Sequence, residues 1–412
     1  MKIVIAGAGI GGLTAALSLH AAGMSDITVL EAAREIQQVG VGINLPPHAV
    51  RELQELGLSD ALAQVGLLTD ELAYYDTTGT LIWAEKRGLN AGYLWPQYSI
   101  HRGKLQQILL DATRNRLGKH AVLTGQRVEA VESSVDHVRI RITDIQTGVN
   151  SEQTAALLIG ADGIRSAVRT ALYGDKKIRL ATNGWTMYRG TSRTTPFLTG
   201  RSMVIVGDEN QRCVAYPIDK NTVNWIVARP SLKEGNTTVE LGNWNKPFGP
   251  DIIAKYLEDW SFEWLDIPEM VRASEIAYEY PMADIDPLPQ WTFGRVTLLG
   301  DAAHAMYPFG SNGSSQAILD ARILAYELAR HTDLDEALSI YENQRRPMVS
   351  AVQLANRSQA SDVMARVSAM ARARDHSNAA AELMQVEEKY KHLAGFDVET
   401  LNTRASWNIV SS

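Results

Sequence analysis

The stretch from Lys2 to Glu31 constrains the fold more than any other part of the chain. It opens with Ile3–Ala6, four apolar and mostly β-branched residues that are typical of a buried parallel strand. A G-x-G-x-x-G sequence follows, then an apolar run at helical spacing, and Ile27–Leu30 indicates a second strand. The order predicts a strand–helix–strand unit with a glycine-rich turn before its helix. The glycines of the turn are Gly7, Gly9 and Gly12.

Each part of this turn suits a dinucleotide. Gly7 allows a tight turn, Gly9 lets the backbone approach a pyrophosphate, and Gly12 lets the helix pack against the strand. The helix N-terminus offers unpaired N–H groups to phosphate. Glu31 ends the second strand and can accept hydrogen bonds from the adenosine ribose. The acid favours NAD or the adenosine half of FAD over NADP at this site, and the motif alone does not choose between NAD and FAD.

Composition excludes several other classes of protein. The chain has 412 residues and a net charge of −7, from 40 Lys and Arg against 47 Asp and Glu, and it has no long basic run. This balance argues against nucleic acid and against an anionic membrane as partners. The single cysteine, Cys213, excludes an internal disulfide and is expected in the core. No cluster of Cys and His suggests a metal site.

The N-terminal apolar residues also resemble a signal peptide or a membrane anchor. Ile3–Leu19 is too short and too rich in glycine for a membrane span, and only Lys2 precedes it as a charge. The phosphate-binding interpretation accounts for every glycine. We therefore expect a cytoplasmic protein with no membrane partner.

The predicted elements give an α/β fold in four parts. Residues 1–175 form the first part of a Rossmann-like dinucleotide-binding domain, and 176–291 form a β-rich insertion that contains most of the tryptophans. Residues 292–330 return to the first domain, and 331–412 form C-terminal helices. Gln38–Asn44 is predicted as a glycine-punctuated loop.

Two acids follow predicted buried strands. Asp162 comes after Ala155–Gly160, and Asp301 comes after Val296–Gly300. Ligands of an open parallel sheet bind at the carboxyl ends of its strands. After Asp301 the glycine-rich stretch 310–313 precedes a helix, whose N-terminus carries roughly half a positive charge. Such a terminus suits an isoalloxazine, which becomes negative on reduction.

These motifs carry a family resemblance. The chain resembles the class A flavoprotein aromatic hydroxylases, which are single-component FAD monooxygenases with a para-hydroxybenzoate hydroxylase-like fold. The match rests on three motifs in order: the G-x-G-x-x-G turn, Asp162-Gly163, and Gly300-Asp301 with its Ala-Ala-His tail. Within the family the stretches GVGIN, PQYSIHRG and VAYPI are similar to those of phenazine hydroxylases. This similarity implies a planar polycyclic or heteroaromatic substrate.

The resemblance also implies a set of FAD contacts. It implies that Glu31 holds the ribose, Arg102 reaches the pyrophosphate or ribityl chain, Val128 meets the adenine and Asp301 holds a ribityl hydroxyl. Asp162 belongs to a motif linked to both FAD and the pyridine nucleotide. The remaining implied contacts, which face the flavin ring, are Val41, Gly42, Gly310, Gly313 and Ser314.

The implied chemistry resides in the cofactor. NADH or NADPH binds transiently and reduces FAD, and the reduced flavin reacts with O2 to a C4a-hydroperoxide that gives one oxygen to an aromatic ring. No side chain is assigned as catalytic and no metal is expected. The protein supplies position, electrostatics and exclusion of water.

The substrate is expected between the β-rich insertion and the flavin. Arg189 suits a carboxylate. The candidate contacts are Arg189, Tyr216 and Pro308, with Tyr188, Met203 and Trp225 as further side chains on predicted strands.

Several functions stay open at this point. The W-x-W-x-I-P signature of flavin halogenases is missing. Epoxidation, Baeyer–Villiger oxidation and ring rearrangement all keep the same motifs, and a non-enzymatic flavin-binding redox sensor or scaffold is the alternative from another class. The C-terminal helices, with Met364, Met370 and Met384, are expected to pack on the core rather than form a dimer face, and the oligomeric state is left open.

Overall fold

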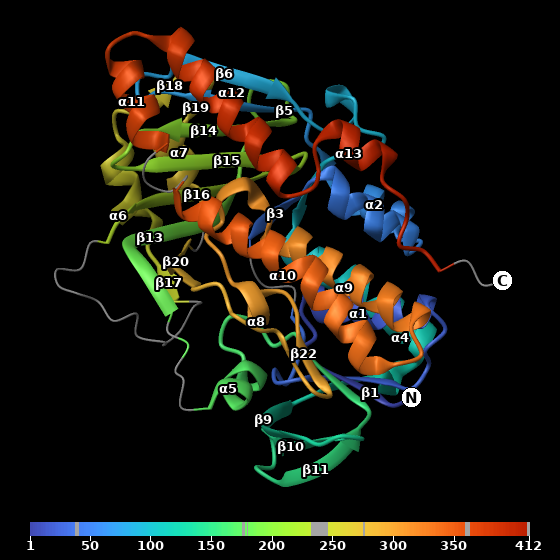
Figure 1. The fold of residues 1–412 in the computed structure, drawn as a ribbon. Helices are drawn as coiled ribbons and strands as arrows, with labels where there is room; N and C mark the ends of the chain where they lie inside the picture. Colours follow the sequence, from blue (N-terminus) through green and yellow to red (C-terminus); the bar gives the residue numbers. More distant parts are fainter. Residues whose placement is uncertain are drawn as a thin grey trace.

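The computed structural model describes residues 1–37, 41–174, 178, 180–231, 246–274, 277–358 and 363–409. Figure 1 shows a helix-covered sheet beside a larger, mainly antiparallel sheet, with a small three-stranded sheet at one end and helices α10 to α12 running along one side. This arrangement confirms the predicted α/β class.

The first sheet has six strands in the order β21-β22-β12-β1-β2-β8, and all its neighbours are parallel except β21 and β22. The sequence predicted its central part because each of these strands is a short apolar run. The strands are β1 (Ile3–Ala6), β2 (Ile27–Glu31), β8 (Val122–Thr124), β12 (Leu157–Gly160), β21 (Thr292–Phe293) and β22 (Val296–Leu298).

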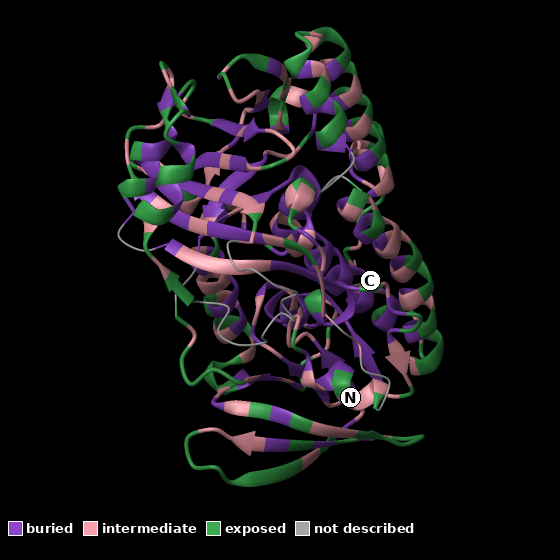
Figure 2. Cartoon of the chain, turned by 90° about the vertical axis from the view of Figure 1, so that its left-hand side faces the viewer, coloured by how far each residue is buried: buried purple, intermediate pink, exposed green. Residues whose placement is uncertain are grey.

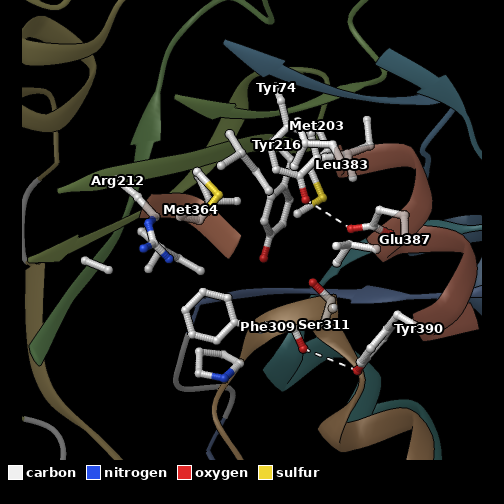
Figure 3. Close-up of a pocket in the computed structure, with 18 of the residues that line it drawn as sticks. Tyr74, Met203, Arg212, Tyr216, Phe309, Ser311, Met364, Leu383, Glu387 and Tyr390 are labelled. Atoms are coloured by element: carbon white, nitrogen blue, oxygen red, sulfur yellow. Dashed lines mark hydrogen bonds between the residues drawn. The ribbon is translucent and has the colours of Figure 1, made fainter. Parts of the chain in front are cut away.

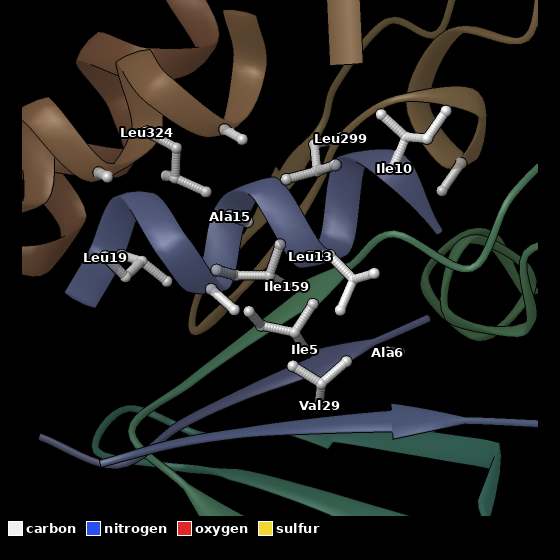
Figure 4. Close-up of a cluster of buried hydrophobic side chains, with 14 of the residues drawn as sticks. Ile5, Ala6, Ile10, Leu13, Ala15, Leu19, Val29, Ile159, Leu299 and Leu324 are labelled. Atoms are coloured by element: carbon white, nitrogen blue, oxygen red, sulfur yellow. The ribbon is translucent and has the colours of Figure 1, made fainter. Parts of the chain in front are cut away.

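Helix α1 (Ile10–Ala21) lies between this sheet and helix α9 (Gly313–Arg330). Figure 4 shows Ile5, Val29 and Ile159 of the sheet on one side of α1, with Leu299 and Leu324 on the other. Nearly every residue of α1 is buried, which explains an apolar sequence with little amphipathic character. The glycine turn before α1 is thereby fixed at the carboxyl end of β1.

Two further groups of elements surround the sheet. The three-stranded antiparallel sheet β11-β10-β9 alternates buried and exposed residues and has much of its surface exposed (Figure 2). Its strands are β9 (Gln126–Ser133), β10 (Val138–Asp144) and β11 (Asn150–Ala155). The helices nearby are α2 (Pro47–Glu55), α3 (Ser59–Val65), α4 (Arg102–Leu117), α5 (Ala167–Tyr173) and the short α8 (Asp301–His304).

The largest sheet has eight strands in the order β17-β20-β13-β16-β15-β14-β5-β6. The hairpin β5–β6 comes from the N-terminal part of the chain, and β5 pairs in parallel with β14 of the predicted insertion. The four-part division of the chain stays a prediction, and in space this hairpin lies with the second part. The strands are β5 (Glu71–Tyr75), β6 (Leu81–Lys86), β13 (Leu180–Arg193), β14 (Ser202–Gly207), β15 (Arg212–Asp219), β16 (Thr222–Pro230), β17 (Lys246–Phe248) and β20 (Ala277–Ile285).

The two faces of this sheet pack against different elements. One face buries a core with α6 (Pro250–Ala254) and α7 (Ile267–Arg272), two helices that the β-rich interpretation did not predict. The other face packs against α11 (Met364–Arg372) and α12 (His376–Leu393). The C-terminal region also contains α10 (Leu334–Ser358) and α13 (Val398–Thr403).

One local prediction is wrong in part. The predicted loop 38–44 includes the start of strand β3 (Gly42–Leu45), which pairs with β7 (Tyr98–His101) because the apolar Ile43 and Leu45 find a partner strand far along the chain. Residues 38–40 of the loop lie outside the described residues. Strand β4 (Leu67–Leu68) joins this small sheet, and β18 (Ser261–Phe262) pairs with β19 (Leu265–Asp266). The described residues also form four short 3-10 turns: η1 (Gly88–Ala91), η2 (Lys119–Ala121), η3 (Lys255–Leu257) and η4 (Phe309–Ser311).

Across the described ranges, no helix combines the length and the apolar character that crossing a bilayer requires.

Candidate active site

The glycine turn after β1 has the geometry that a pyrophosphate requires. Gly7 has a φ of +104°, and a Cβ there would lie 2.4 Å from the carbonyl oxygen of Ala161. A Cβ on Gly12 would lie 2.0 Å from the carbonyl oxygen of Gly7, so α1 packs directly on the turn. A Cβ on Gly9, by contrast, would meet no atom within 4 Å. The turn is therefore tight on the protein side and open at Gly9, where phosphate oxygens would reach the helix N-terminus.

Glu31 is joined to this turn by hydrogen bonds. Its Oε2 accepts from the backbone N–H of Ala8, and its Oε1 accepts from that of Ala33, both at 2.8 Å. A carboxylate has about four lone-pair sites, so both oxygens keep capacity for ribose hydroxyls. The predicted role of Glu31 fits this position.

The other predicted contacts of the adenosine and phosphate end differ in their exposure. Arg102 is exposed at the start of α4, and its backbone N–H donates to the carbonyl of Val41 at 3.0 Å. Its charge is therefore available at the surface beside β3. Val128 is buried in β9 and contributes its side chain to the main core, so its backbone is the part that could meet an adenine.

The carboxylate of Asp162 accepts hydrogen bonds from the start of a helix. It accepts from the Ser166 hydroxyl at 2.5 Å and from the backbone N–H groups of Ala167 and Val168 at 2.7 and 3.1 Å, at the start of α5. Burial raises the pKa of Asp162, and these hydrogen bonds oppose the rise. Any contact of Asp162 with a cofactor would therefore use its backbone.

Asp301 has the opposite environment. Its side chain is exposed at the first turn of α8, after Gly300 with a φ of +59°. The turn is held from below by the buried Asp320, whose Oδ2 accepts from the Gly300 N–H at 3.0 Å. Burial tends to raise the pKa of Asp320, but Arg345 and His304 outweigh it and lower the pKa to about 2. The turn that carries the exposed carboxylate of Asp301 is thus held in place by the buried, charged Asp320.

Arg169 links the turn that contains Asp162 to the turn that contains Asp301. Its guanidinium donates to the carbonyl of Ile164 at 2.5 Å and to that of Ala302 at 2.9 Å. The turns after β12 and β22 are therefore neighbours at the carboxyl edge of the sheet, as the predicted position for ligands requires.

The segment before α9 is tightly packed. Gly310 has a φ of +69°, and a Cβ there would lie 2.4 Å from the ring of Tyr390. Asn312 precedes Gly313, the first residue of α9, and its Oδ1 is 2.9 Å from Nε2 of the buried His48. Gly313 and Ser314 open the helix and are only partly buried. A Cβ on Gly313 would meet only Met306, at 3.9 Å, so the first residue of α9 is the part of this segment that a planar ring could approach.

A cavity lies between this segment, the large sheet and the C-terminal helices (Figure 3). Its volume is ≈ 140 Å³, well above the ~10–15 Å³ that one water molecule needs. Most of its wall is apolar. The lining includes Met203, Ile205, Val214, Tyr216, Ile226 and Ala228 from the sheet, Met364, Leu383, Val386 and Phe396 from the C-terminal region, and Pro308, Phe309, Gly310 and Ser311.

A few polar groups interrupt this wall. The Tyr74 hydroxyl donates to Glu387 at 3.0 Å, and Arg87 pairs with the other carboxylate oxygen at 3.2 Å. Arg212 lies over the rings of Trp185 and Phe309, at 5.1 and 5.7 Å from their centroids. Burial lowers the pKa of Arg212 to about 10, and it stays a cation at neutral pH.

The predicted substrate residues lie in three places: along the cavity, beside strand β3, and in the core on the opposite face of the sheet. Met203, Tyr216 and Pro308 line the cavity, and Figure 3 shows the Tyr216 hydroxyl pointing toward Phe309 and Ser311. Arg189 instead reaches strand β3, where its Nη2 donates to the carbonyl of Gly42 at 3.2 Å.

Tyr188 and Trp225 were wrong choices. Both are buried in the core on the opposite face of the sheet, since neighbours in a strand point to opposite sides. The Trp225 indole N–H is satisfied there by Ser192 and Ser274. Their strand neighbours Met187 and Ile226 line the cavity instead.

The sequence interpretation missed the contribution of the C-terminal helices. Met364, Leu383, Glu387 and Tyr390 all line the cavity, whereas Met384 is exposed. The available signal was the spacing of Leu383, Glu387 and Tyr390 on one face of a helix. It shows that α12 has a buried face, but not which element covers it.

Comparison with known proteins agrees with this geometry. The family described as "FAD binding domain" matches residues 1–355, and the chain belongs to this family. It is an FAD-dependent aromatic hydroxylase, an oxidoreductase that uses NADH or NADPH as electron donor. The predicted family is confirmed.

Particular relatives can be named. The chain is 46% identical over 366 residues to the phenazine 1,6-dicarboxylic acid hydroxylase PhzS of Lysobacter antibioticus, covering 86% of this chain and 89% of that one. It is 32% identical over 362 residues to 3-hydroxybenzoate 6-hydroxylase 1 of Aquipseudomonas alcaligenes, covering 86% and 88%. Klebsiella pneumoniae HpxO complexed with FAD and uric acid has a similar structure, with a TM-score of 0.74, 26% identity and coverage of 96% and 92%.

Proposed function

We propose that the chain hydroxylates a planar, fused heteroaromatic acid in the cavity between the large sheet and the Pro308–Ser311 segment. The observation that carries this proposal is an apolar cavity with a buried cation, Arg212, in its wall. Apolar walls favour a flat aromatic ring, while a few placed polar groups fix its orientation.

The substrate class draws support from the named relatives. PhzS of Lysobacter antibioticus is called a phenazine 1,6-dicarboxylic acid hydroxylase, and it shares nearly half of its aligned residues with this chain. A phenazine carboxylate would place its tricyclic ring against the apolar wall of the cavity and its carboxylate near Arg212. Guanidinium and carboxylate match as bidentate partners.

The cofactor would lie along the carboxyl edge of the first sheet. Glu31, the glycine turn, Arg102 and Asp301 would hold FAD from the adenosine end to the ribityl chain, and Val41, Gly42 and the segment Gly310–Ser314 would flank its ring. FAD held there would supply the redox chemistry, namely acceptance of a hydride from NADH or NADPH and activation of O2 for transfer of one oxygen atom to the aromatic ring. The apolar side chains of the cavity exclude water, which would otherwise divert reducing equivalents to hydrogen peroxide.

Arg212→Met tests the proposed substrate class. We expect the KM for phenazine-1,6-dicarboxylic acid to rise about tenfold to a hundredfold, because a hydrogen bond to a charged group contributes roughly 1.5–3 kcal/mol. For uncharged phenazine the KM should change little. The measurement is substrate-stimulated NAD(P)H oxidation, with product confirmed by mass.

Leu198→Met, a substitution at an exposed position away from the cavity lining, serves as the control. An equal loss for the acid and for phenazine would mean that Arg212 supports the fold of the wall and not the carboxylate. No stimulation by any fused heteroaromatic acid would contradict the substrate class itself.

A further inference from the structure

The first peptide of strand β3 is held from two sides. The Val41 carbonyl accepts from the backbone N–H of Arg102 at 3.0 Å, at the start of α4. The Gly42 N–H donates to Oδ1 of Asn224 at 2.6 Å, and the Gly42 carbonyl accepts from Nη2 of Arg189 at 3.2 Å. Every polar backbone group between the Val41 carbonyl and the Gly42 carbonyl therefore has a partner, and two of the three partners are side chains of the large sheet.

Asn224 leaves no space above Gly42. A Cβ on Gly42 would lie 2.8 Å from both Cβ and Cγ of Asn224 and 2.8 Å from Cγ2 of Ile218. Asn224 is fully buried on β16, opposite Tyr216 of β15, which lines the cavity. The side chain thus lies between the proposed substrate cavity and the strand that should flank the flavin.

One buried donor at this position, Nε of Arg189, has no hydrogen-bond acceptor among the described residues. The Asn224 amide is within hydrogen-bonding reach of the Tyr216 hydroxyl. Buried donors without partners are costly, and each one calls for an explanation. The carbonyl oxygens and ring nitrogens of an isoalloxazine are acceptors of the required kind. Arg189 and the nearby Arg102 also place positive charge beside strand β3, which suits a ring that becomes negative on reduction.

We propose that Asn224 is a positioning residue for the flavin. Its Oδ1 accepts the hydrogen bond from the Gly42 N–H and so fixes strand β3 against the edge of the cofactor. Arg189 assists from the carbonyl side of the same peptide, and it acts on the cofactor rather than on the substrate. The proposal rests on the proposed function, because it needs FAD beside Gly42. Asn224 thereby sets the distance between the flavin and the aromatic ring to be hydroxylated.

Two variants that keep the branching of the side chain at Cγ separate this role from packing. Asn224→Asp keeps an oxygen acceptor for the Gly42 N–H, whereas Asn224→Leu removes it. Asn221→Leu makes the same chemical change at an exposed position of the same hairpin and serves as the matched control. Should Asn224→Leu fail to fold, Asn224→Ala removes the acceptor with a smaller side chain.

Three quantities are measured on each purified protein: the Kd for FAD from flavin fluorescence, the visible absorption spectrum of bound flavin, and the ratio of hydroxylated product to hydrogen peroxide. Asn224→Leu should weaken FAD binding about tenfold, alter the flavin spectrum and shift NAD(P)H consumption toward peroxide. Asn224→Asp should keep the FAD affinity within about threefold and retain most of the coupling. Asn221→Leu should match the wild type in all three.

Two results would overturn the inference about Asn224. If both Asn224 variants lower the melting temperature alike and leave the FAD affinity, spectrum and coupling unchanged, Asn224 only packs and the inference is wrong. If Asn224→Asp is as uncoupled as Asn224→Leu, the acceptor is not what matters, and the inference is also overturned. Failure of the proposed function is distinguishable, because the wild type itself would then give no hydroxylated product from fused heteroaromatic acids.

Discussion

At the scale of the residue, the protonation state of the buried His48 bears on the segment that precedes α9. It lies on α2, stacks on Phe396 at 4.4 Å between ring centroids, and its Nε2 is 2.9 Å from Oδ1 of Asn312. Burial lowers the pKa of His48 from 6.5 to about 3, so the folded protein holds it neutral. The segment before α9 therefore depends on an uncharged imidazole.

This depressed pKa predicts a loss of stability in mild acid. The unfolded chain takes up a proton at His48 as the pH falls below about 6.5, while the folded chain does so only near its lowered pKa. The contribution to stability is thus present above pH 6.5 and decreases as the pH falls toward 3, at up to about 1.4 kcal/mol per pH unit.

His48→Gln should reduce the slope of the unfolding free energy against pH by nearly one proton between pH 6 and 4. Urea unfolding at several pH values measures this slope. His120→Gln, at an exposed position, serves as the control for removal of an imidazole. An unaltered slope in His48→Gln would mean that His48 titrates in the folded protein as it does in water.

At the scale of the element, the C-terminal helices shape the segment that should face the flavin. Alternate carbonyls of this segment accept from side chains of α10 and α12. Gln353 donates to Ala305 at 3.1 Å, Asn356 to Tyr307 at 3.0 Å, and the Tyr390 hydroxyl to Phe309 at 3.4 Å. The conformation around Pro308 is therefore fixed by helices that come after it in the chain.

Asn356→Leu tests the link between these helices and the cofactor. The Tyr307 carbonyl would be left unpaired in a buried position, which costs about 1–3 kcal/mol. We expect weaker FAD binding and more hydrogen peroxide per NAD(P)H consumed, measured by flavin fluorescence and a peroxide assay. Asn343→Leu, exposed on the same helix, is the control. A variant that melts at a lower temperature with unchanged FAD affinity and coupling would show that α10 only supports the fold.

The same elements mark the limit of what the sequence could predict. The β1–α1–β2 unit and the acids Asp162 and Asp301 were predictable because the apolar runs and turns that define them are local in sequence. The pairing of β5 with β14 and the approach of α12 to the cavity depend on contacts between distant segments. Hydrophobic periodicity identifies a buried face but does not say what covers it. The prediction that Tyr188 and Trp225 contact the substrate was wrong for a related reason. A strand has two faces, and the sequence did not show which one borders the cavity.

At the scale of the whole molecule, the candidate site lies where three units meet. The parallel sheet presents the glycine turn, Glu31 and Asp301 at its carboxyl edge, the large sheet supplies one wall of the cavity, and the C-terminal helices supply the other (Figures 1 and 3). The cofactor can thus be held by one unit while the substrate is enclosed by the other two. A family built in this way can keep the elements that hold the adenosine end of FAD while it varies the walls of the cavity.

The proposed function requires that this cavity direct an oxygen atom from O2 onto a fused heteroaromatic acid. The most direct measurement supplies the FAD-loaded protein with NAD(P)H, phenazine-1,6-dicarboxylic acid and ¹⁸O₂, and determines the mass of the product and the yield of peroxide. We expect a hydroxylated product that carries one ¹⁸O atom, NAD(P)H oxidation that the acid stimulates, and little peroxide. Hydrogen peroxide as the sole product, at a rate that the acid does not change, would contradict it.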